Sequence, residues 1–267
     1  MSRAVSSHPR TTALVTGASR GIGLELARQF AEHGHDVILV ARSREALETV
    51  AAELRKEHGV SAHVLVSDLS HPDACPKLFD KVAEAGLQVD FLVNNAGFGL
   101  GGKFSETDGA RELDMIQVNI AALTHLTKLF LPPMLSRGSG RIMQVASIAA
   151  FQPGPMMAVY YASKAYVLSF SQAISEELRD AGVTVTALCP GPTETNFAKT
   201  AHVTNSIPFA PVAVASASEV ARYGYSAMMR GKRIALPSFR DRFLVQVQRV
   251  VPRAMVTRIV KKVMENR

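Results

Sequence analysis

Hydrophobic positions along the chain follow two alternating patterns. Short runs that are apolar at nearly every position, such as Val-Ile-Leu-Val-Ala before Arg42, are typical of strands buried on both faces of a parallel sheet. Longer stretches carry apolar residues three and four apart, as at Leu47, Val50 and Leu54, which indicates amphipathic helices. These patterns predict strands at residues 11–16, 36–42, 61–67, 91–94, 141–146, 183–189 and 233–236, and helices at residues 22–33, 43–58, 72–85, 112–135, 159–181 and 218–229.

The regular alternation of strand and helix predicts an α/β fold. We expect a doubly wound parallel sheet of the Rossmann type, with about seven strands and helices on both faces. No repeat or linker interrupts residues 11–237, so we expect one domain there. It follows a flexible tail at residues 1–10 and precedes an extension at residues 238–267.

Composition narrows the class of protein. A chain of 267 residues that is 47% hydrophobic suits one large domain or two small ones. The two cysteines, Cys75 and Cys189, fit no metal or redox spacing, so we expect no metal and a reducing, cytoplasmic location. The first ten residues lack the apolar core of a signal peptide, and no apolar run approaches the ~20 residues that span a bilayer.

The net charge of +7 is concentrated at the C-terminus. From residue 230 onward there are eleven Lys and Arg against two acidic residues, which leaves the preceding 229 residues at −2. The body therefore has no charge support for binding nucleic acid.

The basic extension has a helical pattern of its own. Apolar residues recur at Phe243, Leu244, Val247, Val250 and Val251, and Pro252 can start a second helix. That helix would carry Val256, Ile259, Val260 and Val263 on one side, with Arg253, Arg258, Lys261 and Lys262 supplying charge. Such a segment suits peripheral contact with an anionic membrane, a partner subunit or an acidic substrate, and it equally suits a helix that covers the core.

A glycine-rich turn follows the first predicted strand and opens the first helix. It reads Gly17-Ala18-Ser19-Arg20-Gly21-Ile22-Gly23. Gly17 allows a tight turn, Gly23 allows the helix to approach the sheet, and the helix N-terminus offers free N–H groups to a pyrophosphate. A plain strand-to-helix turn is the alternative, but the context favours dinucleotide binding.

Tyr160 and Lys164 lie four residues apart on a predicted helix, so their side chains are neighbours, whereas Tyr161 points about 100° away. An ammonium beside a phenol favours the phenolate, so we expect Lys164 to lower the pKa of Tyr160 and prepare it for proton transfer. Ser147 follows the fifth strand, where its hydroxyl can hydrogen-bond a substrate oxygen. Alternatively, the Tyr–Lys spacing arises by chance, and Ser147 merely caps a turn.

The chain combines the glycine turn preceded by Thr, the run Asn94-Asn95-Ala96-Gly97, Ser147, and the spacing Tyr160-x-x-x-Lys164. With these features it resembles the short-chain dehydrogenase/reductase family over roughly residues 11–237. The resemblance implies that Tyr160 is the acid/base, that Lys164 also bonds the nicotinamide ribose, and that Ser147 anchors the substrate oxygen. It implies that Asn119 holds a water linking Lys164 to solvent, although it could be merely structural. It makes Asn94 a brace of the central sheet. The implied cofactor contacts are Gly17, Ser19, Arg20, Gly21, Ile22, Gly23, Arg42, Asp68, Leu69, Asn95, Ala96, Gly97, Tyr160, Lys164, Pro190, Gly191, Thr193 and Thr195.

Charge at the end of the second strand indicates which cofactor binds. Enzymes that use NAD usually place Asp or Glu there, whereas this chain has Ala41 followed by Arg42. Arg42 can hold a 2′-phosphate with two hydrogen bonds, and Arg20 supplies a second cation. Asp36 lies at the opposite end of the strand. We therefore predict NADP(H), with Arg42 stacking on adenine as the alternative, and reduction as the favoured direction.

The predicted function is that of an NADP(H)-dependent oxidoreductase that transfers hydride between the cofactor and a carbonyl or alcohol. Residues 196–217 are rich in Ala, Val, Pro and Phe and would form a loop over a hydrophobic ketone or aldehyde, although a loop packed on its own core has the same composition. The alternative function is a non-catalytic NADP(H)-binding regulator, which we would expect to have lost the Tyr or the Lys. The resemblance also implies a homodimer or homotetramer, formed through the helices at residues 112–135 and 159–181.

Overall fold

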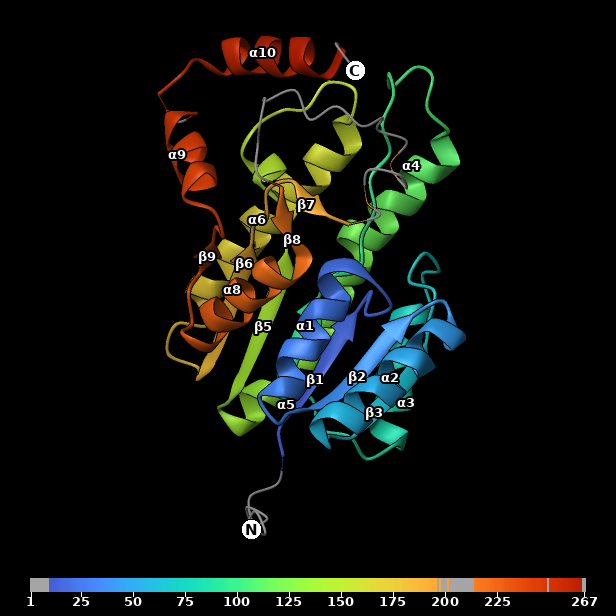
Figure 1. Ribbon diagram of the computed structural model, residues 1–267. Coiled ribbons are helices and arrows are strands. Elements are labelled where there is room, and N and C mark those ends of the chain that lie inside the picture. Colours follow the sequence, from blue (N-terminus) through green and yellow to red (C-terminus); the bar gives the residue numbers. More distant parts are fainter. Residues whose placement is uncertain (1–9, 196, 198–200, 202–213, 249, 266–267) are drawn as a thin grey trace.

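A seven-stranded parallel sheet forms the centre of the molecule, which we describe from a computed structural model for residues 10–195, 197, 201, 214–248 and 250–265 (Figure 1). The strand order is β3-β2-β1-β4-β5-β6-β9, which confirms the predicted doubly wound fold. The chain reverses its direction of travel across the sheet between β1 and β4, where such sheets bind ligands. The strands are β1 (Thr12–Thr16), β2 (Asp36–Ala41), β3 (Ala62–Val66), β4 (Phe91–Asn94), β5 (Gly140–Val145), β6 (Val183–Leu188) and β9 (Ile234–Ala235).

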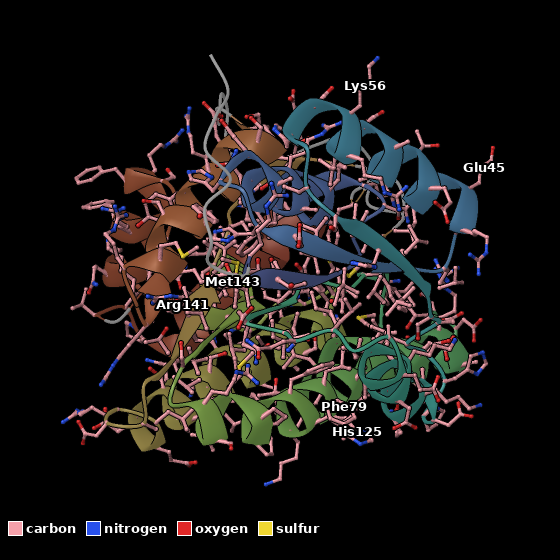
Figure 2. The ribbon with its side chains drawn as sticks, turned by 90° about the horizontal axis from the view of Figure 1, so that it is seen from below. Glu45, Lys56, Phe79, His125, Arg141 and Met143 are labelled. Carbon is pink, nitrogen blue, oxygen red and sulfur yellow. The ribbon has the colours of Figure 1, made fainter. Side chains whose placement is uncertain are left out.

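Alternate residues along the strands belong to two hydrophobic cores, one on each face of the sheet. Val37 and Leu39 of β2 belong to the core under α1 (Gly21–Glu32), α2 (Arg44–His58) and α8 (Ala217–Met229), whereas Ile38 and Val40 belong to the opposite core. Figure 2 shows both layers, with Glu45 and Lys56 on one side of the sheet and Phe79 and His125 on the other. The continuous apolar runs in the sequence follow directly, because both faces of these strands are buried.

The helices match the predicted order with shifted ends. One difference is internal, because the helix predicted at residues 112–135 begins at Gly109 and contains a π-helical turn at Gln117–Ala122. The helices are α1 (Gly21–Glu32), α2 (Arg44–His58), α3 (Ala74–Glu84), α4 (Gly109–Ile116), α5 (Leu123–Arg137), α6 (Ala158–Glu177), α8 (Ala217–Met229), α9 (Phe239–Val247) and α10 (Arg253–Glu265).

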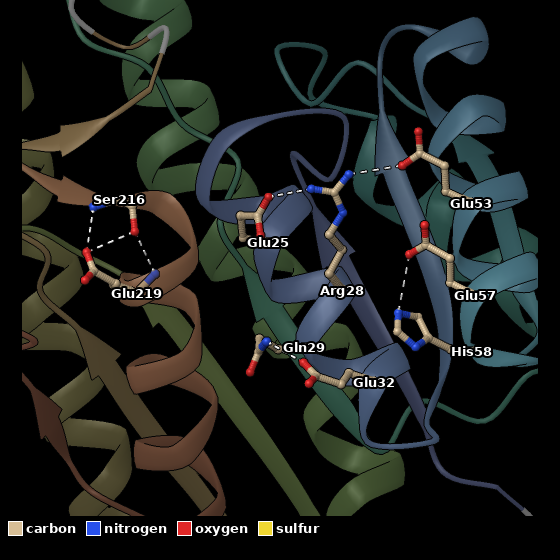
Figure 3. A network of polar contacts seen from close by, with 9 residues as sticks. All are labelled: Glu25, Arg28, Gln29, Glu32, Glu53, Glu57, His58, Ser216 and Glu219. Carbon is tan, nitrogen blue, oxygen red and sulfur yellow. Dashed lines mark hydrogen bonds and ion pairs between the residues drawn. The ribbon is translucent and has the colours of Figure 1, made fainter.

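Local polar contacts set several helix positions. Ser43 caps α2 by accepting a hydrogen bond from the Ala46 N–H at 3.3 Å. Ser216 and Glu219 form a capping box that opens α8, and Arg28 joins Glu25 on α1 to Glu53 on α2 (Figure 3). The Arg28 pairs are only partly buried and contribute little to stability, so burial of the two cores holds the layers together.

Two short strands close the base of the segment predicted to cover the substrate. β7 (Thr193–Glu194) pairs with β8 (Ala215–Ser216), so the two ends of this segment lie together. The predicted loop extends to residue 217, whereas the chain re-enters regular structure at residue 215. Of residues 196–214, Phe197, Ala201 and Val214 are described, and the rest lie outside the described residues.

The C-terminal extension forms α9 and α10, as its pattern predicts. The buried side of α9 is made by Asp241 and Val245, while Phe239 and Phe243 are 81% and 62% exposed. The apolar stripe read from the sequence therefore faces solvent on α9. Within the described residues, no helix combines the length and hydrophobicity needed to cross a membrane.

Candidate functional site

A cavity of about 1140 Å³ opens at the carboxyl ends of the parallel strands. Its wall runs from the glycine turn after β1, past β2 and β4, to Tyr160 on α6. Of the predicted site residues, Gly23 and Asn119 lie behind the wall. The others line the cavity: Gly17, Ser19, Arg20, Gly21, Ile22, Arg42, Asp68, Leu69, Asn95, Ala96, Gly97, Ser147, Tyr160, Lys164, Pro190, Gly191, Thr193 and Thr195.

The glycine turn is packed tightly against Asn95. Gly17 has φ +67° and Gly21 has φ +59°, a conformation that side-chain-bearing residues rarely adopt. A Cβ on Gly23 would lie 2.3 Å from both the Asn95 Nδ2 and the Gly17 carbonyl oxygen. Glycine at position 23 is therefore required for the start of α1 to approach the turn.

Thr16, directly before the glycine turn, links that turn to the turn after β4. Its hydroxyl accepts hydrogen bonds from the backbone N–H groups of Asn95 and Ala96, each at 3.0 Å. The Asn95 side chain donates in return to the Thr16 carbonyl at 2.8 Å. The turns after β1 and β4 are therefore joined into one rigid floor.

The donor groups at this floor suit a dinucleotide. α1 begins at Gly21, and among the described residues no side chain caps its first turn. Uncapped N–H groups and the positive end of the helix dipole attract a phosphate. The shape and the donor chemistry of this end of the cavity therefore fit a pyrophosphate.

Arg20 follows β1 and Arg42 follows the neighbouring strand β2; both residues line the cavity, and both are exposed. Asp68 after β3 accepts hydrogen bonds from the Ser70 N–H at 3.1 Å and the Ser70 hydroxyl at 2.9 Å. Burial raises the pKa of Asp68, but these bonds and the charge of Arg42 outweigh it and lower the pKa overall. Asp36 lies at the other end of β2, where it accepts from the Ser61 N–H.

Tyr160, Ser147 and Lys164 meet at the inner end of the cavity. The Ser147 hydroxyl hydrogen-bonds the Tyr160 phenol, and the Phe197 ring lies 5.1 Å from the Tyr160 ring, centroid to centroid. Lys164 donates to the Val145 carbonyl at 2.8 Å, with its Nζ 5.9 Å from the centre of the Tyr160 ring. The three predicted side chains are thus brought together from the segment that follows β5 and from α6.

The expected lowering of the Tyr160 pKa is wrong. Burial raises the pKa of Tyr160 to about 12, against a lowering influence from Ser147. Burial also lowers the pKa of Lys164 to about 8. The helical spacing places Lys164 near Tyr160, but its ammonium is held at the Val145 carbonyl rather than at the phenol.

Asn119 lies in the π-helical turn and is 1% exposed. Its side chain accepts from the Phe98 N–H at 3.1 Å and donates to the Phe98 carbonyl at 3.0 Å. It also donates at 3.1 Å to the hydroxyl of Ser163, which donates to the Tyr160 carbonyl at 2.7 Å. A Cβ on Gly97 would lie 2.9 Å from the Asn119 Oδ1, so glycine leaves room for this clamp.

Ser163 was not among the predicted site residues. It joins Asn119 to the backbone of Tyr160, and it is completely buried. Its position directly before Lys164 was the available signal, because a small polar residue on the buried side of a helix needs a partner. Asn94 is confirmed as a brace, since its amide donates to Gln144 of β5 and Thr127 of α5.

The turn after β6 closes the cavity from the other side. A Cβ on Gly21 would lie 3.3 Å from the Thr195 methyl group, so this turn lies against the glycine turn. Asp241 of α9 is 8% exposed and accepts a hydrogen bond from the Gly191 N–H. Sequence reasoning missed Asp241, because nothing in the pattern of the extension pairs it with a turn fifty residues earlier.

The comparisons with known proteins agree with this geometry. A family profile described as short chain dehydrogenase matches residues 11–205. A putative ketoacyl reductase from Streptomyces coelicolor is 42% identical over 188 residues, which span 70% of this chain and 72% of that protein. For several other curated relatives, the matched segment spans between 53% and 62% of their length.

Solved structures extend the agreement to the fold. A short-chain dehydrogenase from Sphingobium yanoikuyae in complex with NADPH has a TM-score of 0.80 at 30% identity, covering 91% of this chain and 97% of that one. A short-chain dehydrogenase/reductase from Burkholderia phymatum in complex with NAD has a TM-score of 0.79 at 25% identity, covering 91% and 94%. The chain belongs to the short-chain dehydrogenase family of oxidoreductases.

Proposed function

We propose that the protein reduces an apolar ketone or aldehyde with NADPH, using Tyr160 as the proton donor. The observation that carries this proposal is the arrangement of one cavity. Its inner end holds the Ser147 hydroxyl, the Tyr160 phenol and the Lys164 ammonium, and its other end holds an uncapped helix N-terminus and two arginines.

The preference for NADPH over NADH rests on charge. Arg20 and Arg42 line the cavity beside the end of β2, where Ala41 takes the place of a carboxylate. Two guanidinium groups favour a 2′-phosphate, whereas an Asp or Glu would repel it. The related structures do not decide the matter, since one contains NADPH and another contains NAD.

The side chains at the inner end suit proton transfer to a carbonyl oxygen. A bound nicotinamide supplies the hydride to the carbonyl carbon. Ser147 donates a hydrogen bond to the substrate oxygen and so stabilises the negative charge that develops there. Tyr160, whose pKa is about 12, holds its proton at neutral pH and can pass it to the alkoxide, a far stronger base than a phenolate.

Lys164 would offset the charge that this transfer leaves behind. With a pKa of about 8 it is mostly protonated at neutral pH, and it lies within one helical turn of Tyr160. Asn119 and Ser163 hold the backbone of Tyr160 in position. These contacts place the phenol without requiring it to move during the reaction.

The substrate class follows from the walls around Tyr160. Phe98, Met157, Tyr161, Phe197 and Met264 line the cavity, and the last four pack in one apolar cluster with Tyr160. Apolar walls with a few polar groups at one point favour a compound that has one carbonyl on an apolar body. The name of the Streptomyces relative points in the same direction, to ketoacyl compounds.

Replacing Tyr160 by Phe tests the proposal. Turnover of a ketone panel, followed by NADPH absorbance, should fall by about 100-fold or more, because the proton donor is lost while the ring is kept. NADPH binding, followed by fluorescence titration, should stay within about twofold of wild type.

Tyr161→Phe is the matched control, because Tyr161 also lines the cavity and is the neighbouring residue. It should keep turnover within a few-fold of wild type. Retained turnover in Tyr160→Phe together with loss in Tyr161→Phe would assign the proton donor to the other tyrosine. Retained turnover in both would overturn the proposed mechanism.

A further inference from the structure

The last helix of the chain has two unlike sides. Val256, Val260 and Met264 recur every four residues on α10 and are 9%, 8% and 7% exposed. Met255 and Ile259 lie on another side of the same helix and are 53% and 50% exposed. The sequence pattern placed Ile259 on the apolar side with Val256 and Val260, so the observed buried side is rotated from the predicted one.

The buried side of α10 packs over the inner end of the cavity. Val256, Val260 and Met264 form one hydrophobic cluster with Met157 and Ala201. Partly buried residues that pack against this cluster include Tyr160, Tyr161 and Phe197. Met264 also lines the cavity itself. Figure 1 shows α10 lying across the end of the molecule toward which the strands point.

Two polar contacts of the preceding segment hold the extension to the catalytic elements. Gln248 donates at 2.6 Å to the side chain of Gln152, which directly follows the short helical turn Ile148–Phe151 that Ser147 caps. Asp241 of α9 accepts from the N–H of Gly191 in the turn after β6. The extension is therefore attached to the segments that bear Ser147 and Pro190.

We infer that α10 is the roof of the substrate chamber and that Met264 determines how large an apolar group the enzyme accepts. This inference rests on the proposed function, since it assigns the space between Tyr160 and Met264 to the body of a ketone. The carbonyl lies at Ser147 and Tyr160, and its apolar chain extends beneath α10 to the thioether of Met264. The favoured substrates are ketones with an extended apolar chain.

A purely structural helix would bury the same residues, so the test compares the two sides of α10. Met264→Ala is paired with Met255→Ala, which removes the same atoms from the exposed side. Both variants are assayed with 2-butanone, whose chain is too short to reach the roof, and with 2-decanone. NADPH affinity and the melting temperature are measured for each.

Met264→Ala should lower kcat/KM for 2-decanone by about tenfold, the effect of losing apolar contacts in a hydrophobic pocket. It should leave kcat/KM for 2-butanone and the Kd for NADPH within about twofold, since neither ligand touches residue 264. Met255→Ala should change none of these values. The inference is overturned if both methionine variants behave alike, or if Met264→Ala affects both ketones equally. Val260→Ala serves as a second roof variant if Met264→Ala fails to fold.

A labelling experiment tests the roof without turnover. Met264→Cys and Met255→Cys are treated with methyl methanethiosulfonate in the presence of NADP+, which has no hydride to transfer, with and without 2-decanone. The native thiols give little background, because burial raises the pKa of Cys75 to about 11 and that of Cys189 to about 12. The ketone should slow labelling at residue 264 several-fold and leave residue 255 unchanged.

Together, the turnover assay and the labelling assay distinguish a failure of the proposed reaction from a failure of the inferred roof. If the wild-type protein reduces no ketone but 2-decanone protects residue 264, the proposed reaction fails and the chamber beneath α10 stands. If ketones are reduced, but 2-decanone does not protect residue 264 and Met264→Ala affects both ketones equally, the proposed reaction stands and the assignment of α10 as the roof is wrong.

Discussion

The two ends of the cavity are built in different ways. The cofactor end consists of backbone turns that pack so closely that a single added carbon at Gly23 would collide with Asn95 and Gly17. The substrate end is walled by flexible side chains such as Met157 and Met264, contributed by segments more than a hundred residues apart. A site of this kind can keep one cofactor while its substrate changes, because methionine adapts to different shapes and a glycine turn does not.

Gly23→Ala is expected to have the largest effect, because it adds atoms where there is no room. The Cβ would lie 2.3 Å from a backbone oxygen, so the turn must deform and the helix N-terminus must move. NADPH affinity should fall by about 100-fold or more, with a loss of stability of about 1–3 kcal/mol from overpacking. Fluorescence titration and thermal unfolding measure the two effects.

Gly109→Ala is the control for this variant, since a Cβ at Gly109 would meet nothing within 4 Å and the residue opens α4. It should leave NADPH affinity and stability near wild type. Wild-type affinity in Gly23→Ala would contradict the view that the cofactor end tolerates no added volume.

Lys164, at the junction of the two ends, makes stability depend on pH. Burial lowers its pKa from 10.5 to about 8, so between these values the unfolded chain binds a proton that the folded protein does not. The free energy of unfolding should therefore rise with pH across this window, by at most about 1.4 kcal/mol per pH unit. Lys164→Met lacks this contribution, and the difference between the two unfolding curves measures it.

The difference between wild type and Lys164→Met cancels the other groups that titrate in the same range. It should be steepest between pH 8 and 10.5 and flat below pH 7. A difference that stays flat up to pH 10.5 would show that burial does not lower the pKa of Lys164.

Arg42→Ala is expected to have the smallest effect, because Arg42 is exposed and its charge is screened. The affinity for NADPH should fall by about tenfold, while that for NADH should change by less than about twofold. Arg44→Ala is the control, since Arg44 lies two residues further along, pairs with Glu48 and does not line the cavity. Equal losses of NADPH and NADH affinity in Arg42→Ala would favour stacking on adenine over binding of the 2′-phosphate.

Much of the cofactor end was predictable because its signals are local. Gly17, Gly21 and Gly23 lie within one turn, and Asn95 follows the next strand of the sheet in a recognisable run. The order of strands and helices was predictable for the same reason, since burial on both faces of a strand leaves a continuous apolar run. The spacing of Tyr160 and Lys164 predicted neighbours on one helix, and both residues lie on α6 and line the cavity.

What escaped prediction depends on contacts between distant segments. The sequence spacing implied an ammonium beside the phenol, but the carbonyl of Val145 holds Lys164, and burial raises the pKa of Tyr160 instead. The link from Asn119 through Ser163 to Tyr160 crosses from the π-helical turn to α6. Helical periodicity describes one helix at a time, so it cannot say which neighbour a side chain meets.

By itself the sequence determined the parallel sheet, the glycine turn and the side chains that line one cavity, because each is encoded by residues close together in the chain. Only the tertiary structure decided how the C-terminal extension is used. Its apolar residues fit either side of a helix, and packing against Met157 and Phe197 selected the side that bears Val260 and Met264. Burial is a property of the folded assembly of segments, and no segment carries it alone.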